Sequence, residues 1–326
     1  MKSKMPGAPP LASLCLAVAG AAASVAAGAG QPAEITIPGE RVFPESLTST
    51  RDGTVIFGSL GARTIFRSKP NSANAEAWIP AGTVPGLNSI FGVFADDRSN
   101  TLWACSGTMG RPQPGSTPAP STLFALDLKT GAVKGSYPLP SPGATCNDIA
   151  VGADGAAYAT DTANMLLLRL PKGGNALEIW AGSDGAFGPK GGVLDGVAVL
   201  GNRVLVNTLA TSKFFAVPIG KDGKAGPVSE LRFSRTIERP DGMRSYENDS
   251  LLIAETGSGG KLALVKIDGD SGVVTTLKEG FPGGPVSVTA VGDTAYVLEG
   301  QLGLLFRPNA DAKAQPFRAT AVTIKP

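Results

Sequence analysis

Four oxygen-bearing side chains occupy the same place in a repeated sequence unit, and together they have the chemistry of a metal site. They are Glu45, Asn147, Asp195 and Asp241, each at the start of a short apolar run. In every unit a turn and a second short run follow, and the units recur at intervals of roughly 45–60 residues, a spacing typical of repeat folds. Carboxylates that converge repel one another, which raises the pKa of at least one of them unless a cation lies between them.

The residue types at these positions favour a hard cation. Carboxylate and amide oxygens suit calcium first, then magnesium or manganese, with zinc as a further alternative. The sequence contains no histidine, which excludes Ser-His-Asp catalysis, Cys-His catalysis and a histidine-ligated zinc site. An isolated Asp-Gly or Asn-Asp pair is more commonly a turn former, so the shared repeat position carries the prediction. A cation that only holds the repeats together is the alternative to a catalytic one.

Six such units are expected to form the scaffold that brings these side chains together. Each unit contains short strands joined by tight turns, and four such strands make up one blade of a β-propeller. The 43 glycines and 26 prolines agree with many short strands and turns, and no segment has a long helical period. We therefore expect an all-β, six-bladed β-propeller with an axial metal site.

Propeller geometry turns the repeats into a spatial prediction. The innermost strand of each blade begins at the mouth of the central channel, and the second strand returns there. The expected first residues of the inner strands are Glu45, Phe91, Asn147, Asp195, Asp241 and Val286. The expected last residues of the second strands are Ser59, Ser106, Asp161, Asn207, Glu255 and Glu299. The ordinary role of this second ring is strand-end capping, and we expect at most two of its members to contact a ligand.

Three other segments carry expectations about the fold. Closure of the ring is expected to use a terminal strand, with residues 33–38 and 321–324 as the candidates. Residues 303–306, Gly-Leu-Leu-Phe, are expected to form the third strand of the last blade. The glycine- and proline-rich segment 107–121 is expected to lie over the mouth, either as a lid or as a surface loop.

The N-terminus has the pattern of a secretory signal peptide. Lys2 and Lys4 precede an apolar run at 11–19 and a zone rich in small residues. We expect a signal peptide at 1–30, a single propeller domain at 31–326 and a periplasmic or secreted protein with no membrane association after cleavage. Removing the two lysines from the 29 basic residues leaves 27, equal to the 27 acidic residues. This charge balance gives no indication of a nucleic-acid partner. The protein is also expected to be a monomer that acts on a small molecule.

Cys105 and Cys146 are the cysteines that remain after the expected cleavage. Each lies in a strand of a neighbouring repeat, so an oxidising compartment would allow a disulfide between repeats. Two buried thiols are the alternative.

These motifs resemble the family of senescence marker protein (regucalcin), gluconolactonase and luciferin-regenerating enzyme. The resemblance rests on Pro44-Glu45, Cys146-Asn147-Asp148, Asp195-Gly196-Val197 and above all Arg239-Pro240-Asp241-Gly242-Met243, and it extends from about residue 40 to the end. It implies one divalent cation on the axis, calcium first, held by Glu45, Asp195 and Asp241, with Asn147 in contact with substrate or metal. It also implies hydrolysis of a lactone or related ester, with Asp241 as the general base.

Three positions depart from the family pattern. Asp195 stands where the family usually has asparagine, which adds a negative charge beside the metal. Thr145 stands where sugar-lactonase members have arginine. The long acidic loop that follows the second strand of the third repeat in the family is reduced here to residues 162–165. With Asn147 and Glu299, Thr145 is a candidate substrate-binding residue, but the identity of the lactone stays open.

Two alternatives to a lactonase follow from these departures. The first is a non-catalytic propeller that binds a small molecule or a protein and holds a structural calcium. The second is a condensation like that of the strictosidine synthases, which would need a catalytic acid such as Glu299 or Glu255.

Overall fold

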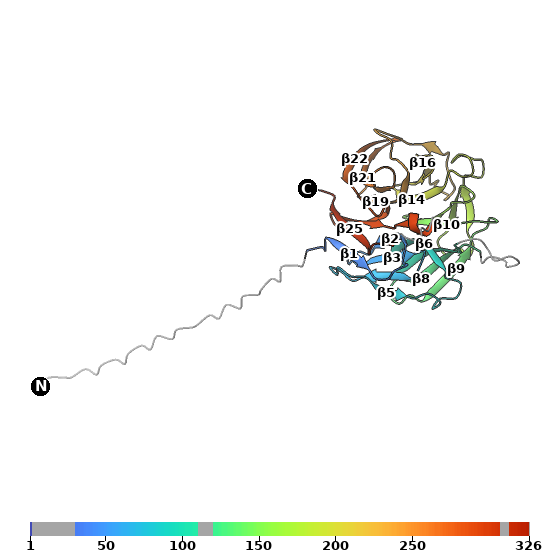
Figure 1. The fold of residues 1–326 in the computed structure, drawn as a ribbon. Helices are drawn as coiled ribbons and strands as arrows, with labels where there is room; N and C mark the ends of the chain where they lie inside the picture. The colour runs from blue at the N-terminus through green and yellow to red at the C-terminus, as the bar shows by residue number, and fades with distance from the viewer. Residues whose placement is uncertain (2–29, 110–119, 307–312, 326) are drawn as a thin grey trace. The chain divides into compact units, whose positions relative to one another are not determined.

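Short apolar runs separated by tight turns form six sheets. The computed structural model describes residues 1, 30–109, 120–306 and 313–325 (Figure 1). Contacts divide the chain into two compact units, Met1–Gly30 and Gln31–Pro326, and the sheets lie in the second. The expected signal peptide lies almost entirely outside the described residues, so it stays a prediction. Within the described ranges, no helix has the length and apolar character needed to cross a membrane.

Each sheet forms one blade. Blade 1 contains β2 (Pro44–Ser49), β3 (Val55–Ser59), β4 (Ile65–Ser68) and β5 (Glu76–Ile79). Blade 2 contains β6 (Ser89–Asp96), β7 (Thr101–Gly107), β8 (Thr122–Asp127) and β9 (Val133–Pro138). Blade 3 contains β10 (Cys146–Val151), β11 (Ala157–Asp161), β12 (Leu166–Leu170) and β13 (Glu178–Ala181).

The second half of the chain repeats the plan with additions. Blade 4 contains β14 (Leu194–Leu200), β15 (Arg203–Thr208), β16 (Lys213–Pro218) and β17 (Ser229–Glu230). Blade 5 contains β19 (Pro240–Tyr246), β20 (Ser250–Glu255), β21 (Lys261–Asp268), β22 (Ser271–Glu279) and a parallel edge strand, β18 (Arg232–Phe233). Blade 6 contains β23 (Pro285–Val291), β24 (Thr294–Glu299), β25 (Phe317–Thr323) and β1 (Glu34–Ile37).

The innermost strands close into a ring. In the order β2, β6, β10, β14, β19 and β23, each strand contacts the next, and β23 contacts β2. The expected six-bladed propeller is therefore confirmed. Buried apolar side chains fill the interface between each blade and the next; between blades 1 and 2, for example, Ile56 and Ile65 pack with Ile90 and Leu102. Burial of this apolar surface is the main force that holds neighbouring blades together.

The ring is closed by the two ends of the domain. Strand β1 pairs antiparallel with β25, with Glu34 opposite Thr320 and Ile37 opposite Phe317. Figure 1 shows these strands side by side, the N-terminal one in blue and the C-terminal one in red. Both segments named for closure are therefore used, and they form the two outer strands of blade 6.

The expected third strand of blade 6, residues 303–306, was wrong. Residues Leu302–Phe306 form a short helix, α1, and the third strand is β25, about ten residues later. A run of four apolar residues has no period that distinguishes a helical turn from a strand. The alternating burial of β25, in contrast, is that of a strand with one face on the core.

A bulge interrupts the inner strand of every described blade at the expected site position. The pairing of inner and second strands shifts between Pro44 and Ser46 in blade 1, and between Cys146 and Ile149 in blade 3. The equivalent shifts in blades 2, 4, 5 and 6 lie at 90–93, 194–197, 240–243 and 285–287. A bulge leaves residues unpaired and re-aims their side chains, so it lets the strand turn its first polar side chain toward the axis.

Glycine follows the site position in three of these bulges because the next strand passes very close. A Cβ atom on Gly92 would lie 2.1 Å from the backbone oxygen of Asn147, and one on Gly196 would lie 2.6 Å from that of Asp241. A Cβ on Gly242 would lie 2.7 Å from the hydroxyl of Ser287. Since the first two obstacles are backbone atoms, no side-chain rotation can relieve them.

The substitution Gly92→Ala is therefore expected to destabilise the propeller by about 3 kcal/mol, at the upper end of overpacking costs. Denaturant unfolding followed by circular dichroism would measure the change. The matched control is Gly303→Ala in α1, where a Cβ would have no neighbour within 4 Å and alanine is the better helix former. Equal losses for the two variants would show that the close approach at Gly92 is not what limits stability.

Candidate metal centre

Glu45, Asp195 and Asp241 lie at the starts of the inner strands β2, β14 and β19, near enough to one another for their charges to interact. Asp195 and Asp241 are 5% and 6% exposed, and the Oε2 atom of the partly exposed Glu45 is buried without a hydrogen-bond partner. None of the three carboxylates forms an ion pair within the described residues. Buried charge that lacks compensation is costly, so the cluster calls for either protons or a cation.

The electrostatics of the cluster agree with this view. Burial, reinforced by the charges of Asp195 and Asp148, raises the pKa of Glu45 well above its usual value. Burial and the nearby charge of Asp148 raise the pKa of Asp195 to about 8, although a hydrogen bond from Asn147 opposes the shift. The pKa of Asp241 is also raised well above its usual value, first by burial and then by Asp195 and Glu45.

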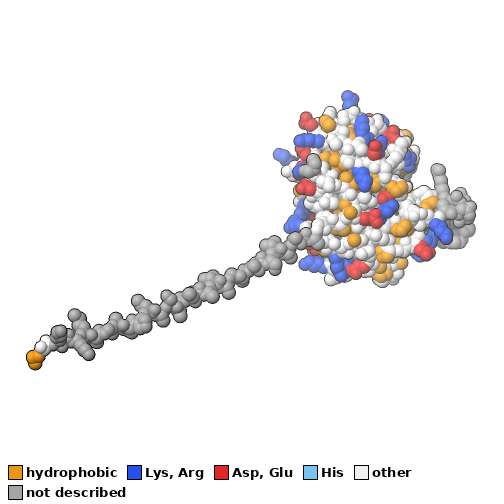
Figure 2. All heavy atoms as spheres, turned by 60° about the vertical axis from the view of Figure 1, so that its left-hand side comes forward, with side chains coloured by type: hydrophobic (Ala, Val, Ile, Leu, Met, Phe, Trp, Pro, Cys, Tyr) orange, Lys and Arg blue, Asp and Glu red, His pale blue; other side chains and the backbone are white. Residues whose placement is uncertain are grey.

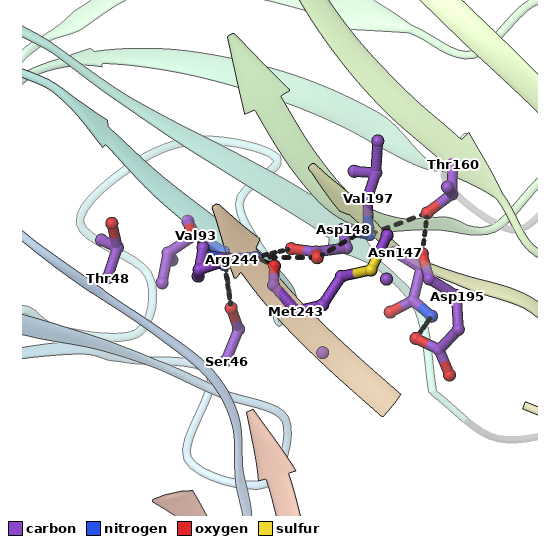
Figure 3. Close-up of polar contacts among 12 residues, drawn as sticks. Ser46, Thr48, Val93, Asn147, Asp148, Thr160, Asp195, Val197, Met243 and Arg244 are labelled. Carbon is purple, nitrogen blue, oxygen red and sulfur yellow. Dashed lines mark hydrogen bonds and ion pairs between the residues drawn. The ribbon is translucent and has the colours of Figure 1, made fainter. Parts of the chain in front are cut away.

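Asn147 completes the predicted set. Its Nδ2 atom donates a hydrogen bond to Oδ1 of Asp195 at 2.7 Å (Figure 3). The amide is buried, 8% exposed, so the predicted ligands of blades 3 and 4 contact each other directly.

The donor chemistry of the set suits a hard divalent cation, although the ligands are not already gathered around a single point. Within the described ranges, no three Asp, Glu or Cys side chains lie close enough together to form a ready-made metal site. Three carboxylates and an amide nevertheless offer only oxygen ligands, which is the preference of calcium. The unpartnered Oε2 of Glu45 is the observation that most directly indicates a missing partner.

An ion pair in the same channel was not predicted from the sequence. Arg244 and Asp148 are 6% and 5% exposed, and Nη1 of the arginine lies 2.8 Å and 3.0 Å from the two carboxylate oxygens (Figure 3). Both residues lie in inner strands whose residues are almost all buried. Because charged residues are almost never fully buried unless paired, their presence in such strands was a usable signal.

Two residues of the second strands hold the bulges in place: Asn207, which the sequence placed at the end of its strand, and Thr160, which was not predicted. Thr160 donates a hydrogen bond to the backbone oxygen of Asp195 at 2.8 Å and accepts one from the amide of Asp148 at 3.0 Å. Asn207 donates to the backbone oxygen of Asp241 at 2.8 Å and accepts from the amide of Gly196 at 3.2 Å. Each therefore ties the bulge of its own blade to that of the next.

Most of the second ring acts as strand-end caps. Asp161 accepts a hydrogen bond from the amide of Thr145 at 3.0 Å. Glu255 accepts one from the amide of Glu238 at 2.8 Å and pairs with Arg235. This is the ordinary role considered for these positions, and it leaves Glu255 engaged away from the axis.

The remaining predicted substrate-binding residues line two separate cavities. Thr145 and Phe91 line a cavity of about 410 Å³ between blades 2 and 3. Glu299 lines another of about 380 Å³ at blade 6, where its carboxylate accepts a hydrogen bond from the amide of Gly283 at 2.7 Å and pairs with Arg318. Among the described residues, neither cavity is lined by Glu45 or an axial aspartate. Residues 110–119 of the expected lid lie outside the described part of the chain.

Cys105 of blade 2 and Cys146 of blade 3 form a disulfide, with their Cα atoms 5.1 Å apart. Of the two alternatives left open by the sequence, the link between repeats is the one the structure shows. Cys146 directly precedes Asn147, so the covalent link anchors the strand that carries a predicted ligand.

Comparison with known proteins identifies the fold. No family model matches the sequence, and no curated protein matches it significantly. Among solved structures, a gluconolactonase from Xanthomonas campestris has 16% identity and a TM-score of 0.58, with 89% of each chain covered. A luciferin-regenerating enzyme has 14% identity and a TM-score of 0.59, covering 89% of this chain and 94% of its own. Virginiamycin B lyase from Staphylococcus aureus has 16% identity and a TM-score of 0.57, covering 82% of this chain and 80% of its own.

At these identities the similarity shows the fold, and it confirms that the chain resembles the gluconolactonase and luciferin-regenerating enzyme propellers in architecture.

Proposed function

We propose that this protein is a divalent-cation-dependent hydrolase of a lactone or related ester. The observation that carries the proposal is a set of three carboxylates that form no ion pair within the described residues, at the starts of three inner strands: the buried Asp195 and Asp241, and Glu45 with its buried, unpartnered Oε2 atom. The similarity in fold to gluconolactonase and luciferin-regenerating enzyme supports a small-molecule substrate. Calcium is the first choice of cation because all the donors are oxygen atoms.

The predicted site residues take distinct roles in this proposal. Glu45, Asn147, Asp195 and Asp241 would hold the cation through carboxylate and amide oxygens. A bound cation would polarise the substrate carbonyl toward attack by water. Asp241 would accept the proton of that water, a role for which a carboxyl pKa above its usual value is suited.

Substrate recognition is assigned to the edge of the site. Thr145 borders the cavity between blades 2 and 3, and Asn147 lies two residues further along the chain, in β10. Glu299 would contribute from blade 6, on the other side of the mouth. Because Thr145 replaces a cationic side chain of the sugar lactonases, we propose a substrate other than an aldonolactone.

The disulfide supports the proposed site of action. Disulfides persist in oxidising compartments, and Cys105 and Cys146 form one. Together with the signal-peptide pattern at 1–30, this supports a periplasmic or secreted protein, proposed to act as a monomer. On the face shown in Figure 2, basic and acidic side chains are interspersed, without a large region of one sign that would attract nucleic acid.

The proposal is tested by elemental analysis of the purified protein followed by a panel of lactones and aryl esters assayed with calcium, magnesium, manganese and zinc. We expect one divalent ion per chain, saturable hydrolysis of at least one panel member, and loss of that activity in chelator. Hydrolysis that chelation leaves unchanged would contradict the proposal.

A non-catalytic propeller with a structural calcium is the second candidate. Two features favour it. Thr145 stands where the sugar lactonases have an arginine, and Asp195 and Asp241 are almost completely buried and line neither of the two cavities. Thermal unfolding that depends on calcium, without turnover of any panel member, would support this candidate over the first.

A further inference from the structure

Arg244 places a permanent positive charge inside the central channel. It lies three residues further along β19 than Asp241, with 6% of its surface exposed. A guanidinium does not lose its proton in proteins, and a buried charge is tolerated only when it is paired and hydrogen-bonded. The carboxylate of Asp148 provides the pairing, at 2.8 Å and 3.0 Å from Nη1.

The side chain of Arg244 crosses the channel. It belongs to β19, whose neighbours in the ring are β14 and β23. Its Nη2 atom donates to the backbone oxygen of Val93 at 3.0 Å, on β6, which is the inner strand opposite. The same nitrogen donates to the backbone oxygen of Leu47 at 3.3 Å, on β2. Figure 3 shows the guanidinium between these strands, and it therefore joins blades 1, 2, 3 and 5.

The contacts in blades 1 and 3 fall next to predicted metal ligands. Nη2 of Arg244 lies 3.4 Å from the hydroxyl of Ser46, the residue after Glu45. Nη1 bonds Asp148, the residue after Asn147. Both contacted residues lie within the bulges that aim the predicted ligands at the axis.

The two remaining ligand-bearing strands are joined to the same guanidinium. Oδ2 of Asp148 also accepts a hydrogen bond from the amide of Val197 at 3.1 Å, two residues after Asp195. Nη1 of the arginine donates to the backbone oxygen of Met243 at 2.8 Å, two residues after Asp241. All four strands that carry a predicted ligand are therefore tied, within two residues of that ligand, to one cation.

We propose that Arg244 is a positioning residue, an internal cation that closes the central channel and fixes the four ligand-bearing bulges relative to one another. Its planar fork of N–H groups can serve acceptors in several strands at once, which the compact ammonium of a lysine cannot. The consequence for cation affinity rests on the proposed function, whereas the consequence for the rigidity of the bulges does not.

The test compares four forms of the full propeller. Arg244→Met alone would leave Asp148 buried without a partner, a defect severe enough to unfold the protein. The decisive variant is therefore Asp148→Asn/Arg244→Met, which removes both charges, and Arg244→Lys keeps the charge while changing its geometry. Arg169→Met is the control, because Arg169 pairs with Glu178 at 3.0 Å on the outer strands of blade 3, away from the channel.

Amide hydrogen exchange in chelator and calcium titration by calorimetry are the two measurements. For the double variant and for Arg244→Lys we expect at least tenfold faster exchange at the amides of Val93 and Val197, and calcium binding at least tenfold weaker. The Arg169→Met control is expected to stay within twofold of the wild type in both. Unchanged exchange at those amides in the double variant would overturn the proposal, as would equal effects in the control. If the wild type binds no calcium, the proposed function fails and the exchange result alone decides this proposal.

Discussion

The variant Asp241→Asn is expected to lower kcat for lactone hydrolysis by about 10²–10⁴-fold, the usual contribution of a general base. The amide cannot accept a proton from the attacking water, yet it keeps the size and one oxygen of the carboxylate. Binding of substrate at the edge of the site should be preserved, so KM is expected to change by less than about threefold. Initial rates across a range of substrate concentrations, at saturating calcium, would separate the two parameters.

Loss of fold must be distinguished from loss of chemistry in this experiment. Because Asp241 has a raised pKa from burial and from two neighbouring carboxylates, the neutral amide is not expected to destabilise the cation-free protein at pH 8. A matched control is Asp222→Asn, in the turn between β16 and β17 of blade 4, whose carboxylate is exposed. Activity of Asp241→Asn within tenfold of the wild type would assign the base to another residue, even if calcium proved essential.

The free energy of unfolding of the cation-free protein is expected to fall as the pH rises from about 4 to about 8. Burial and Asp148 raise the pKa of Asp195 from 3.8 to about 8 in the folded chain. Between these values the folded state keeps a proton that the unfolded state has lost, so each increase in pH favours unfolding. One such group contributes a slope of up to about 1.4 kcal/mol per pH unit. Urea unfolding at a series of pH values in chelator would measure it.

Asp195→Asn tests the origin of this pH dependence. The amide cannot ionise, so the slope between pH 4 and pH 8 is expected to become shallower, and the variant should be more stable than the wild type at pH 8 in chelator. Saturating calcium should also reduce the slope in the wild type, because ionised carboxylates then have a partner. A slope that Asp195→Asn leaves unchanged would show that other groups control the pH dependence.

The fold could be predicted from the sequence because its signals are local and repeated. Short apolar runs that alternate with turns such as Asp52-Gly53 and Asp154-Gly155 recur six times. A strand assigned in one repeat therefore supports the assignment of the equivalent strand in the next. The same repetition aligned Glu45, Asn147, Asp195 and Asp241 before any geometry was known. Where the local pattern varied, as at Leu302–Phe306, the interpretation was wrong, because a short apolar run does not distinguish a helix from a strand.

The supporting structure of the site could not be predicted in the same way because it depends on contacts between distant strands. Arg244 bonds Ser46, which is 198 residues earlier in the chain, and Asp148, which is 96 residues earlier. The bulges are also invisible to pattern analysis, since an unpaired residue within a buried strand has the same composition as its paired neighbours. The predicted ligand positions followed from the repeat alone. The bulges that direct these side chains can be seen only in the pairing register of the strands.

Closure of the ring by β1 and β25 has a consequence for the order of folding. The first strand of the domain, Glu34–Ile37, finds its partner only in Phe317–Thr323, almost at the end of the chain. During synthesis the earlier blades can assemble on their neighbours, but the nascent chain must remain an open arc until its last strand leaves the ribosome. Sequence-distant pairings of this kind make folding slow. Until β25 is available, β1 has no strand to pair with and the outer edge of β24 stays open.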